Sequence, residues 1–147
     1  MQESRDNSIH KWLIIAGRQI SQQLDQRLAS IGLNASNYFY ILKIHDNPGL
    51  TQKILGEKEF IDPSNVTRAV KQLIGQGLIE RRSHPQDKRA YQLVLTTKGA
   101  AVYPQIFQIL DAVEQTLTTA VTAQGADQQH FINALQQISH TNNDSNN

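Results

Sequence analysis

Apolar residues recur at steps of three and four along the start of the chain, a spacing typical of an amphipathic helix. The positions that form this stripe are Ile9, Leu13, Ala16, Ile20, Leu24 and Leu28. The pattern predicts a long helix from about Ser8 to Ala29. The helix should stop near Gly32, because glycine suits the residue that follows a helix end.

Two shorter helices are expected before the middle of the chain. Asn34 is placed to cap the first, which should end at the turn sequence DNPG of residues 46–49. The apolar and aromatic positions that it carries are Tyr38, Ile41 and Leu42, with His45 near its end. Thr51 is placed to cap the second helix, TQKILGEKEF, in which Ile54 and Leu55 should point inward.

The clearest helix start lies just beyond the turn of residues 59–61. Asp62 is a typical N-cap residue, and Pro63 follows at the first helical position, where its missing N–H costs nothing. Gly77 marks the expected end. The predicted buried stripe is Val66, Val70, Leu73 and Ile74, and the opposite face carries Ser64, Asn65, Thr67, Arg68 and Lys71.

Two short strands should follow, from Leu78 to Ser83 and from Arg89 to Leu95, joined by a loop from His84 to Lys88. Along the second strand, Tyr91, Leu93 and Leu95 alternate onto one side. The order of short helix, tight turn, helix and hairpin is that of a helix-turn-helix with a wing.

Two further helices are predicted after the wing. Thr96 or Thr97 should cap a long helix, in which Pro104 either produces a kink or marks the true start. Its apolar face consists of Tyr103, Ile106, Phe107, Leu110, Val113 and Leu117, and the last helix carries Phe131, Ala134, Leu135 and Ile138. The polar end of the chain, SHTNNDSNN, is expected to be disordered.

Composition narrows the functional classes. The 147-residue chain has 39% hydrophobic and 18% charged residues, which is typical of a globular domain. It contains no cysteine, which excludes a disulfide framework and a thiol redox sensor. The start of the chain lacks the pattern of a signal peptide, and no apolar run approaches the roughly 18 residues of a membrane span, so a cytoplasmic protein is expected.

The charge distribution is more informative than the net charge of +1. Residues 63–98 contain seven Lys or Arg against two acidic residues, a local net charge of +5, so the rest of the chain carries −4. A basic segment within an acidic frame concentrates a positive field on one face. Chance clustering on a solvated surface would give the same numbers, so charge alone does not decide between a solvated surface and an anionic partner.

The outward face of the fourth helix suits the major groove of DNA, where Asn pairs with adenine edges and Arg with guanine edges. A wing that carries Lys88 and Arg89 directly after this helix strengthens the case, because an arginine can enter the negative minor groove. Asp87 is best explained as the carboxylate that holds Arg89 in one orientation, since ordering a free arginine costs about 2 kcal/mol of side-chain entropy.

The stretch from Leu33 to Gly99 resembles the MarR family of bacterial winged-helix transcription regulators. The resemblance depends on DPSNVTRAVKQLIGQGLIERR, residues 62–82, and on DKRAYQLVLTTKG, residues 87–99, with its Asp-x-Arg and its Leu-Thr-x-x-Gly. The segment LGEKEF, residues 55–60, departs from the more helical sequence usual in the family. The residues that the resemblance places against DNA are Gln52, Lys53, Ser64, Asn65, Thr67, Arg68, Lys71, Lys88 and Arg89, with Asp87 orienting the wing.

The resemblance also implies a homodimer, in which the terminal helices of two subunits interlock. Two-fold symmetry suits DNA recognition independently, because half-sites repeat about one helical turn apart. The expected divisions are residues 1–32 (dimerisation helix), 33–98 (winged helix-turn-helix DNA-binding domain), 99–140 (dimerisation helices) and 141–147 (disordered tail). The function implied is that of a sequence-specific regulator, a repressor of a pseudo-palindromic operator that a small ligand releases.

Members of the family commonly respond to small aromatic ligands, and Trp12, Tyr38 and Tyr40 are candidate pocket walls or ordinary core aromatics. No cofactor is expected, and no metal, because the five histidines are scattered. Ser83, His84 and Asp87 are too close on one turn to act as a catalytic triad, so an enzyme is not expected. The alternative function is a winged helix that binds another protein, for which apolar residues would be expected on the outward face of the fourth helix.

Overall fold

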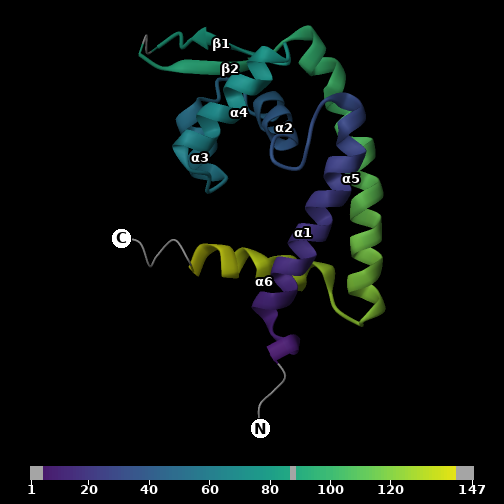
Figure 1. The fold of residues 1–147 in the computed structure, drawn as a ribbon. Coiled ribbons are helices and arrows are strands. Elements are labelled where there is room, and N and C mark those ends of the chain that lie inside the picture. Colours follow the sequence, from purple (N-terminus) through teal and green to yellow (C-terminus); the bar gives the residue numbers. More distant parts are fainter. Residues whose placement is uncertain (1–4, 87–88, 142–147) are drawn as a thin grey trace. The chain divides into compact units, whose positions relative to one another are not determined.

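The predicted winged helix is present in the computed structural model, which describes residues 5–86 and 89–141 (Figure 1). The chain forms two compact units, residues 1–109 and 110–147. In chain order, the elements are η1 (Arg5–Asn7), α1 (Ile9–Leu28), η2 (Ala29–Ile31), α2 (Tyr38–Asp46), α3 (Gln52–Lys58), α4 (Pro63–Gly75), β1 (Ile79–Ser83), β2 (Tyr91–Leu95), α5 (Thr97–Ala123) and α6 (Gln128–Thr141). Helix α5 begins in the first unit and ends in the second. The fold class is therefore mainly α with a two-stranded wing, as predicted.

The first helix, α1, matches its prediction closely. It ends at Leu28 and continues as the short 3-10 turn η2, after which Gly32 adopts a left-handed conformation with φ of 76°. Within the predicted stripe Leu24 and Leu28 are buried, whereas Ile9 at its start is 75% exposed. Only the end of the stripe is therefore buried, and Ile14, which lies outside the stripe, is 58% exposed.

The second helix begins later than predicted, because Asn34 does not cap it. The Asn34 side chain instead accepts hydrogen bonds from the backbone N–H and the hydroxyl of Ser36, at 2.9 and 2.7 Å. These bonds belong to a turn, and α2 starts at Tyr38 with Asn37 before it. Asparagine side chains commonly stabilise turns in this way, in competition with a helix start.

The core of the first unit lies under α2, α4 and the hairpin. Its fully or nearly fully buried apolar residues are Leu24, Leu28, Leu33, Tyr40, Ile41, Ile44, Leu50, Leu55, Val66, Val70, Leu73, Leu78, Ile79, Leu93 and Ile106. Thr51 caps α3 as predicted and accepts a hydrogen bond from the Ile54 N–H at 3.3 Å. Ile54 was predicted to point inward, but it is 41% exposed, so Leu55 alone carries the inward face of that turn.

The wing is an antiparallel hairpin in which Ile79 pairs with Leu95 and Ser83 with Tyr91. A bridge between Thr51 and Gln92 ties the start of α3 to the second strand. The sequence predicted that this strand begins at Arg89, but it begins at Tyr91. Tyr91 is 56% exposed although Leu93 is buried, because the end of the hairpin extends beyond the core.

The end of α4, the start of β1 and the start of α5 meet at one joint. Thr96 caps α5, since its hydroxyl oxygen accepts a hydrogen bond from the Gly99 N–H at 3.0 Å. The same hydroxyl donates to the carbonyl of Gly77 at 2.6 Å. Gly77 ends α4 with φ of 73°, and Gly99 packs directly against the Leu78 carbonyl. Glycine is required at position 99 because the approach leaves no space for a side chain.

A polar cluster joins α2 to α5 within the first unit. The Tyr103 hydroxyl donates to the Asp46 carboxylate at 2.6 Å, and the His45 ring stacks on the Tyr103 ring with centroids 3.7 Å apart. The bond from Tyr103, with a further contribution from His45, lowers the pKa of the Asp46 carboxyl. The same bond raises the pKa of the Tyr103 hydroxyl.

The second unit consists of the rest of α5 and of α6. Val113 is buried, and the Gln128 side chain donates to the Glu114 carboxylate at 3.2 Å.

Pro104 lies inside α5, which starts seven positions earlier at Thr97, so the proline does not mark the helix start. Three aromatic or aliphatic residues predicted on buried faces are more than a third exposed, namely Phe107, Phe131 and Ile138.

The end of the chain is more ordered than predicted as far as the structure describes it. Ser139 to Thr141 belong to α6 rather than to a disordered tail. Residues 142–147 lie outside the described residues.

The start of α4 follows its prediction. Asp62 caps the helix, with its carboxylate accepting from the Ser64 N–H at 2.9 Å and from the Ser64 hydroxyl at 2.5 Å. These bonds, that of the hydroxyl first, lower the pKa of the Asp62 carboxyl. The cap is therefore a charged acceptor at the positive end of the helix dipole.

Substitution of Gly99 tests the joint. A Cβ at this position would lie 2.0 Å from the Leu78 carbonyl oxygen, so Gly99→Ala should lower the free energy of unfolding by about 1–3 kcal/mol or more. The matched control is Gly17→Ala on α1, where a Cβ meets nothing within 4 Å. That change should add about 0.5–1 kcal/mol through helix propensity. Urea denaturation at a fixed protein concentration measures the free energy of unfolding of both variants. Equal changes in the two variants would contradict the close contact of Gly99 with Leu78.

The Asp62 cap predicts a pH dependence. A carboxyl whose pKa is lowered in the folded state stabilises the fold above its unfolded pKa of about 3.9, and the stabilisation is lost as the pH falls through the folded pKa. Asp62→Ala should therefore lower the Tm at neutral pH, and the gap to the wild type should narrow in acid. Asp62→Asn should retain most of the stability at neutral pH, because Asn caps equally well. Circular dichroism melts across the acid range measure this, and a constant gap would exclude the carboxylate as its source.

Candidate nucleic-acid interface

The outward face of α4 is polar from its first turn onward. Ser64, Asn65, Thr67, Arg68 and Lys71 are all exposed, and Val66, Val70 and Leu73 are buried on the opposite side. The Arg68 guanidinium donates to the Asn65 side-chain oxygen at 3.4 Å, so these two residues form one surface. The face therefore offers amide, hydroxyl and guanidinium groups to a polar partner.

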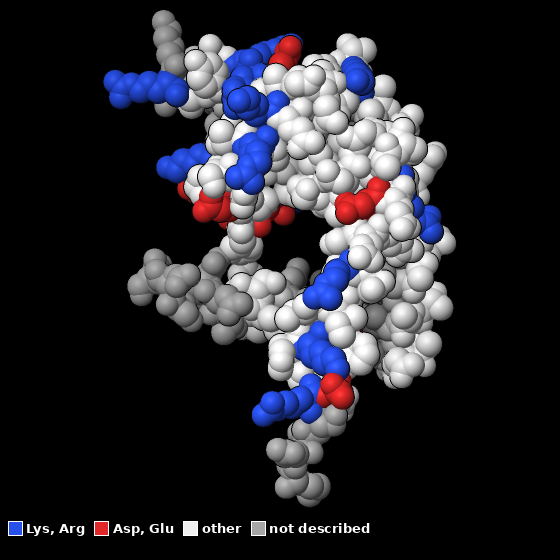
Figure 2. Space-filling model, in the orientation of Figure 1, with Lys and Arg blue, Asp and Glu red and all other residues white. Residues whose placement is uncertain are grey.

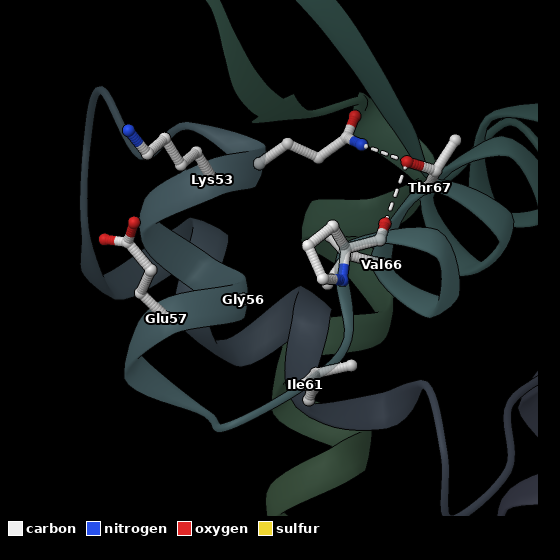
Figure 3. A pocket seen from close by; sticks show the side chains of 8 residues that line it. Lys53, Gly56, Glu57, Ile61, Val66 and Thr67 are labelled. Atoms are coloured by element: carbon white, nitrogen blue, oxygen red, sulfur yellow. Dashed lines mark hydrogen bonds between the residues drawn. The ribbon is translucent and has the colours of Figure 1, made fainter. Parts of the chain in front are cut away.

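Gln52 on α3 connects three elements, α3, α4 and β1. Its side-chain nitrogen donates to the Thr67 hydroxyl at 3.0 Å, and its oxygen accepts from the Arg81 guanidinium at 3.1 and 3.4 Å. The Thr67 hydroxyl in turn donates to the Pro63 carbonyl at 3.0 Å. Figure 3 shows the bonds from Gln52 and to Pro63 meeting at the Thr67 oxygen. Helix α3, helix α4 and strand β1 are thereby held in register.

A groove of about 440 Å³ lies between α3 and α4 beside this cluster. Its apolar floor includes Gly56, Ile61 and Val66, and the charged Lys53 and Glu57 belong to its α3 side (Figure 3). Gly56 is buried, and a Cβ there would lie 3.0 Å from the Val66 side chain. Close packing of α3 on α4 thus explains a glycine inside a helix, where its propensity is about 1 kcal/mol less favourable than that of alanine.

Cations gather over α3, α4 and the hairpin (Figure 2). Arg81, Arg82 and Arg89 are all exposed, and Arg82 pairs with Glu80 at 2.6 Å. Lys53 on α3 and Lys71 on α4 are exposed as well. The predicted wing residues Asp87 and Lys88 lie outside the described residues, so the proposed pairing of Asp87 with Arg89 stays a prediction.

The three candidate pocket aromatics occupy different settings. Trp12 is 54% exposed on α1, and its ring N–H donates to the Asp6 carbonyl at 2.8 Å. Tyr38 is half-buried, which raises the pKa of its hydroxyl. Tyr40 is a core residue that also borders a hollow of about 440 Å³ lined in addition by Asn65, Arg68 and Gln72.

Two other classes of site find no support in the described part of the chain. Among residues 5–86 and 89–141, no group of three His, Cys, Asp or Glu residues is placed to hold a metal ion. None of the helices in these ranges combines the length and the apolarity needed to cross a bilayer.

Sequence reasoning missed the part played by Arg81. This residue was counted among the cations of the basic segment, but it was not assigned to the site. The signal was the two-residue period of the strand, because Arg81 lies on the same side of β1 as the buried Ile79. That side faces the helices, so the Arg81 side chain reaches Gln52 on α3.

Comparison with known proteins agrees with this geometry. Residues 33–91 match the model of the MarR family. The HTH-type transcriptional regulator YybA of Bacillus subtilis is 31% identical over 98 residues, which are 67% of this chain and 65% of YybA. The HTH-type transcriptional regulator SarZ of Staphylococcus saprophyticus is 26% identical over 141 residues, with 88% of this chain and 97% of SarZ covered.

Solved structures show the same fold at lower identity. A crystal structure of S. aureus MepR in complex with DNA superposes with a TM-score of 0.81 at 21% identity, covering 90% of this chain and 98% of that one. A MarR transcriptional regulator from Methanosarcina mazei superposes with a TM-score of 0.75 at 20% identity, covering 91% and 95%. The family match, the named relatives and the shared fold lead to one conclusion: the chain belongs to the MarR family of transcriptional regulators.

Proposed function

We propose that this protein is a sequence-specific regulator that binds a pseudo-palindromic operator in double-stranded DNA as a homodimer. The observation that carries the proposal is the exposed polar face of α4, set between α3 and a cationic hairpin. Such a helix fits the major groove, and the hairpin beside it then lies over the phosphate backbone or the minor groove. MepR, with the same fold, has been crystallised with DNA, which supports the proposal.

The proposed contacts follow from position and chemistry. Asn65, Thr67 and Arg68 lie within the first turns of α4, the part of a recognition helix that meets base edges. Ser64 and Lys71 on α4 and Lys53 on α3, which are all exposed, would contact phosphates. The wing residues Lys88 and Arg89, oriented by Asp87, would enter the adjacent groove. Residues 33–98 are the proposed DNA-binding domain.

The proposed dimer uses residues 1–32 and 99–140. Large apolar side chains are exposed on α1 at Ile9, Trp12 and Ile14, and on α6 at Phe131 and Ile138. Exposed apolar residues grouped on one helix favour a protein partner, because their burial removes apolar surface from water. A second copy of the chain is the partner that a two-fold DNA site requires.

Release by a small ligand is the regulatory part of the proposal. A repressor of this design would leave its operator when an aromatic ligand binds. The hollow beside Tyr40 supports this idea, since a ligand there would touch Asn65 and Arg68 on the recognition helix. Competition between ligand and base contacts would then lower the affinity for DNA.

Oligomeric state provides one test. Sedimentation at micromolar concentration should give a mass of about 33 kDa, twice the 16.5 kDa of the chain. Ile14→Glu should shift the equilibrium toward the monomer, because it places a charge on the exposed apolar part of α1. Gln19→Glu, which adds the same charge at an exposed polar position of α1, is the matched control. A wild-type monomer would remove the basis for a palindromic site.

Arg68 tests the recognition helix directly. Its guanidinium should make a base contact, so Arg68→Ala should cost roughly 1–3 kcal/mol on a site selected from random duplexes and less on scrambled DNA. Competition binding at fixed salt measures the ratio between the two. Arg18→Ala, an exposed arginine on α1, is the control. Equal weakening on both duplexes would assign Arg68 to the phosphate backbone, and an absence of any preferred duplex would favour a protein-binding module instead.

A further inference from the structure

The Thr67 hydroxyl is already engaged inside the protein. It donates its proton to the Pro63 carbonyl at 3.0 Å and accepts a hydrogen bond from the Gln52 side-chain nitrogen at 3.0 Å. A hydroxyl has a single proton to donate. Thr67 therefore cannot donate to a guanine or thymine oxygen without breaking the bond to Pro63.

The orientation of the Gln52 amide is fixed by its other partner. Its oxygen accepts from the Nε and Nη2 atoms of Arg81, at 3.4 and 3.1 Å. Because a guanidinium has only donors, the amide oxygen must face Arg81 and the amide nitrogen must face Thr67. The chain of bonds from Arg81 through Gln52 and Thr67 to Pro63 thus has one consistent direction.

This chain determines which part of Thr67 is left for a partner. The bond from Gln52 draws the hydroxyl toward α3, and the bond to Pro63 holds it against the start of α4 (Figure 3). Thr67 itself remains exposed on the outward face of α4. The methyl group is the part of the side chain that carries no internal bond. In the major groove, the one apolar group on a base edge is the C5-methyl of thymine.

We infer that Thr67 determines specificity by packing its methyl group against the C5-methyl of a thymine in each half-site. Gln52 is then a positioning residue, which holds the Thr67 hydroxyl away from the DNA rather than reading a base itself. This inference rests on the proposed function, since it requires that α4 enters the major groove. The competing possibility is that the remaining lone pair of the Thr67 oxygen accepts from an adenine or cytosine amino group.

The test replaces single thymines of the selected operator by deoxyuridine, which removes only the C5-methyl. With the wild-type protein, one thymine per half-site should show a loss of affinity of about fourfold, the value expected for one buried methyl group. Thr67→Val keeps both methyl-sized branches and lacks the hydroxyl, so it should preserve this discrimination. Thr67→Ser keeps the hydroxyl and lacks the methyl, so it should bind the thymine and deoxyuridine duplexes equally at that position.

Gln52→Ala tests the positioning role. Without the amide, the Thr67 hydroxyl loses the bond that draws it toward α3 and keeps only its bond to the Pro63 carbonyl. The less firmly held side chain should reduce the affinity ratio between the thymine and deoxyuridine duplexes at that same position, while the other thymines are unaffected. A purely structural role of Gln52 would lower the affinity for both duplexes together and leave their ratio unchanged, which would overturn this part of the inference. Circular dichroism melts of each variant establish that it is folded.

The outcomes separate this inference from the proposed function. If the protein prefers its selected site to scrambled DNA but no deoxyuridine changes the affinity, the methyl contact is wrong and the proposed function stands. If Thr67→Val loses the preference and Thr67→Ser retains it, the hydroxyl reads the base and the inference fails. If no selected site is preferred at all, both the inference and the proposed function are overturned.

Discussion

The close approach of Gly99 to the Leu78 carbonyl is the constraint on which the geometry of the first unit depends. At this point α4 has just ended in the left-handed Gly77, β1 is about to begin, and α5 starts with Thr96 as its cap. The Thr96 hydroxyl bonds both to Gly77 and to Gly99, so one side chain ties the end of α4 to the start of α5. A displacement of the start of α5 must therefore move α4 or break these contacts.

Much of the fold followed from local chemistry that is visible in the sequence. Asp62 with Pro63, Thr51 and the glycine after α4 marked true helix boundaries, because capping bonds form between residues close in the chain. The errors had two sources. Asn34 formed a turn with Ser36 instead of a helix cap, a choice between two local structures that the same residue type favours. The exposure of Ile54, Phe107 and Phe131 depends on neighbours far along the sequence and could not be foreseen from periodicity. Periodicity gives the face of a helix, but not whether a neighbour covers that face.

The same distinction applies to the candidate site. The polar face of α4 was predictable because it is the complement of a buried stripe on one helix. The hydrogen-bonded cluster of Gln52, Thr67 and Arg81 was not predictable, because Thr67 and Arg81 lie 15 and 29 positions from Gln52 in the sequence. The contact of Gln52 with DNA stays a prediction, and its amide also bonds two partners within the protein, Thr67 and Arg81. Only the packing of α3 against α4 and the wing brings these three side chains together.

The two arginines of β1, Arg81 and Arg82, are held by different kinds of side chain, one neutral and one charged. Arg82 is held by the carboxylate of Glu80, which compensates its positive charge locally. Exposed ion pairs of this kind contribute little to the stability of the fold and are screened by salt. Arg81 is held by the neutral amide of Gln52, which fixes its direction without compensating its charge. A basic segment with a net charge of +5 therefore does not correspond to five equivalent phosphate contacts. Arg81 is an ordered cation whose charge remains available, because its orienting partner is uncharged and leaves the full attraction to a polyanion intact.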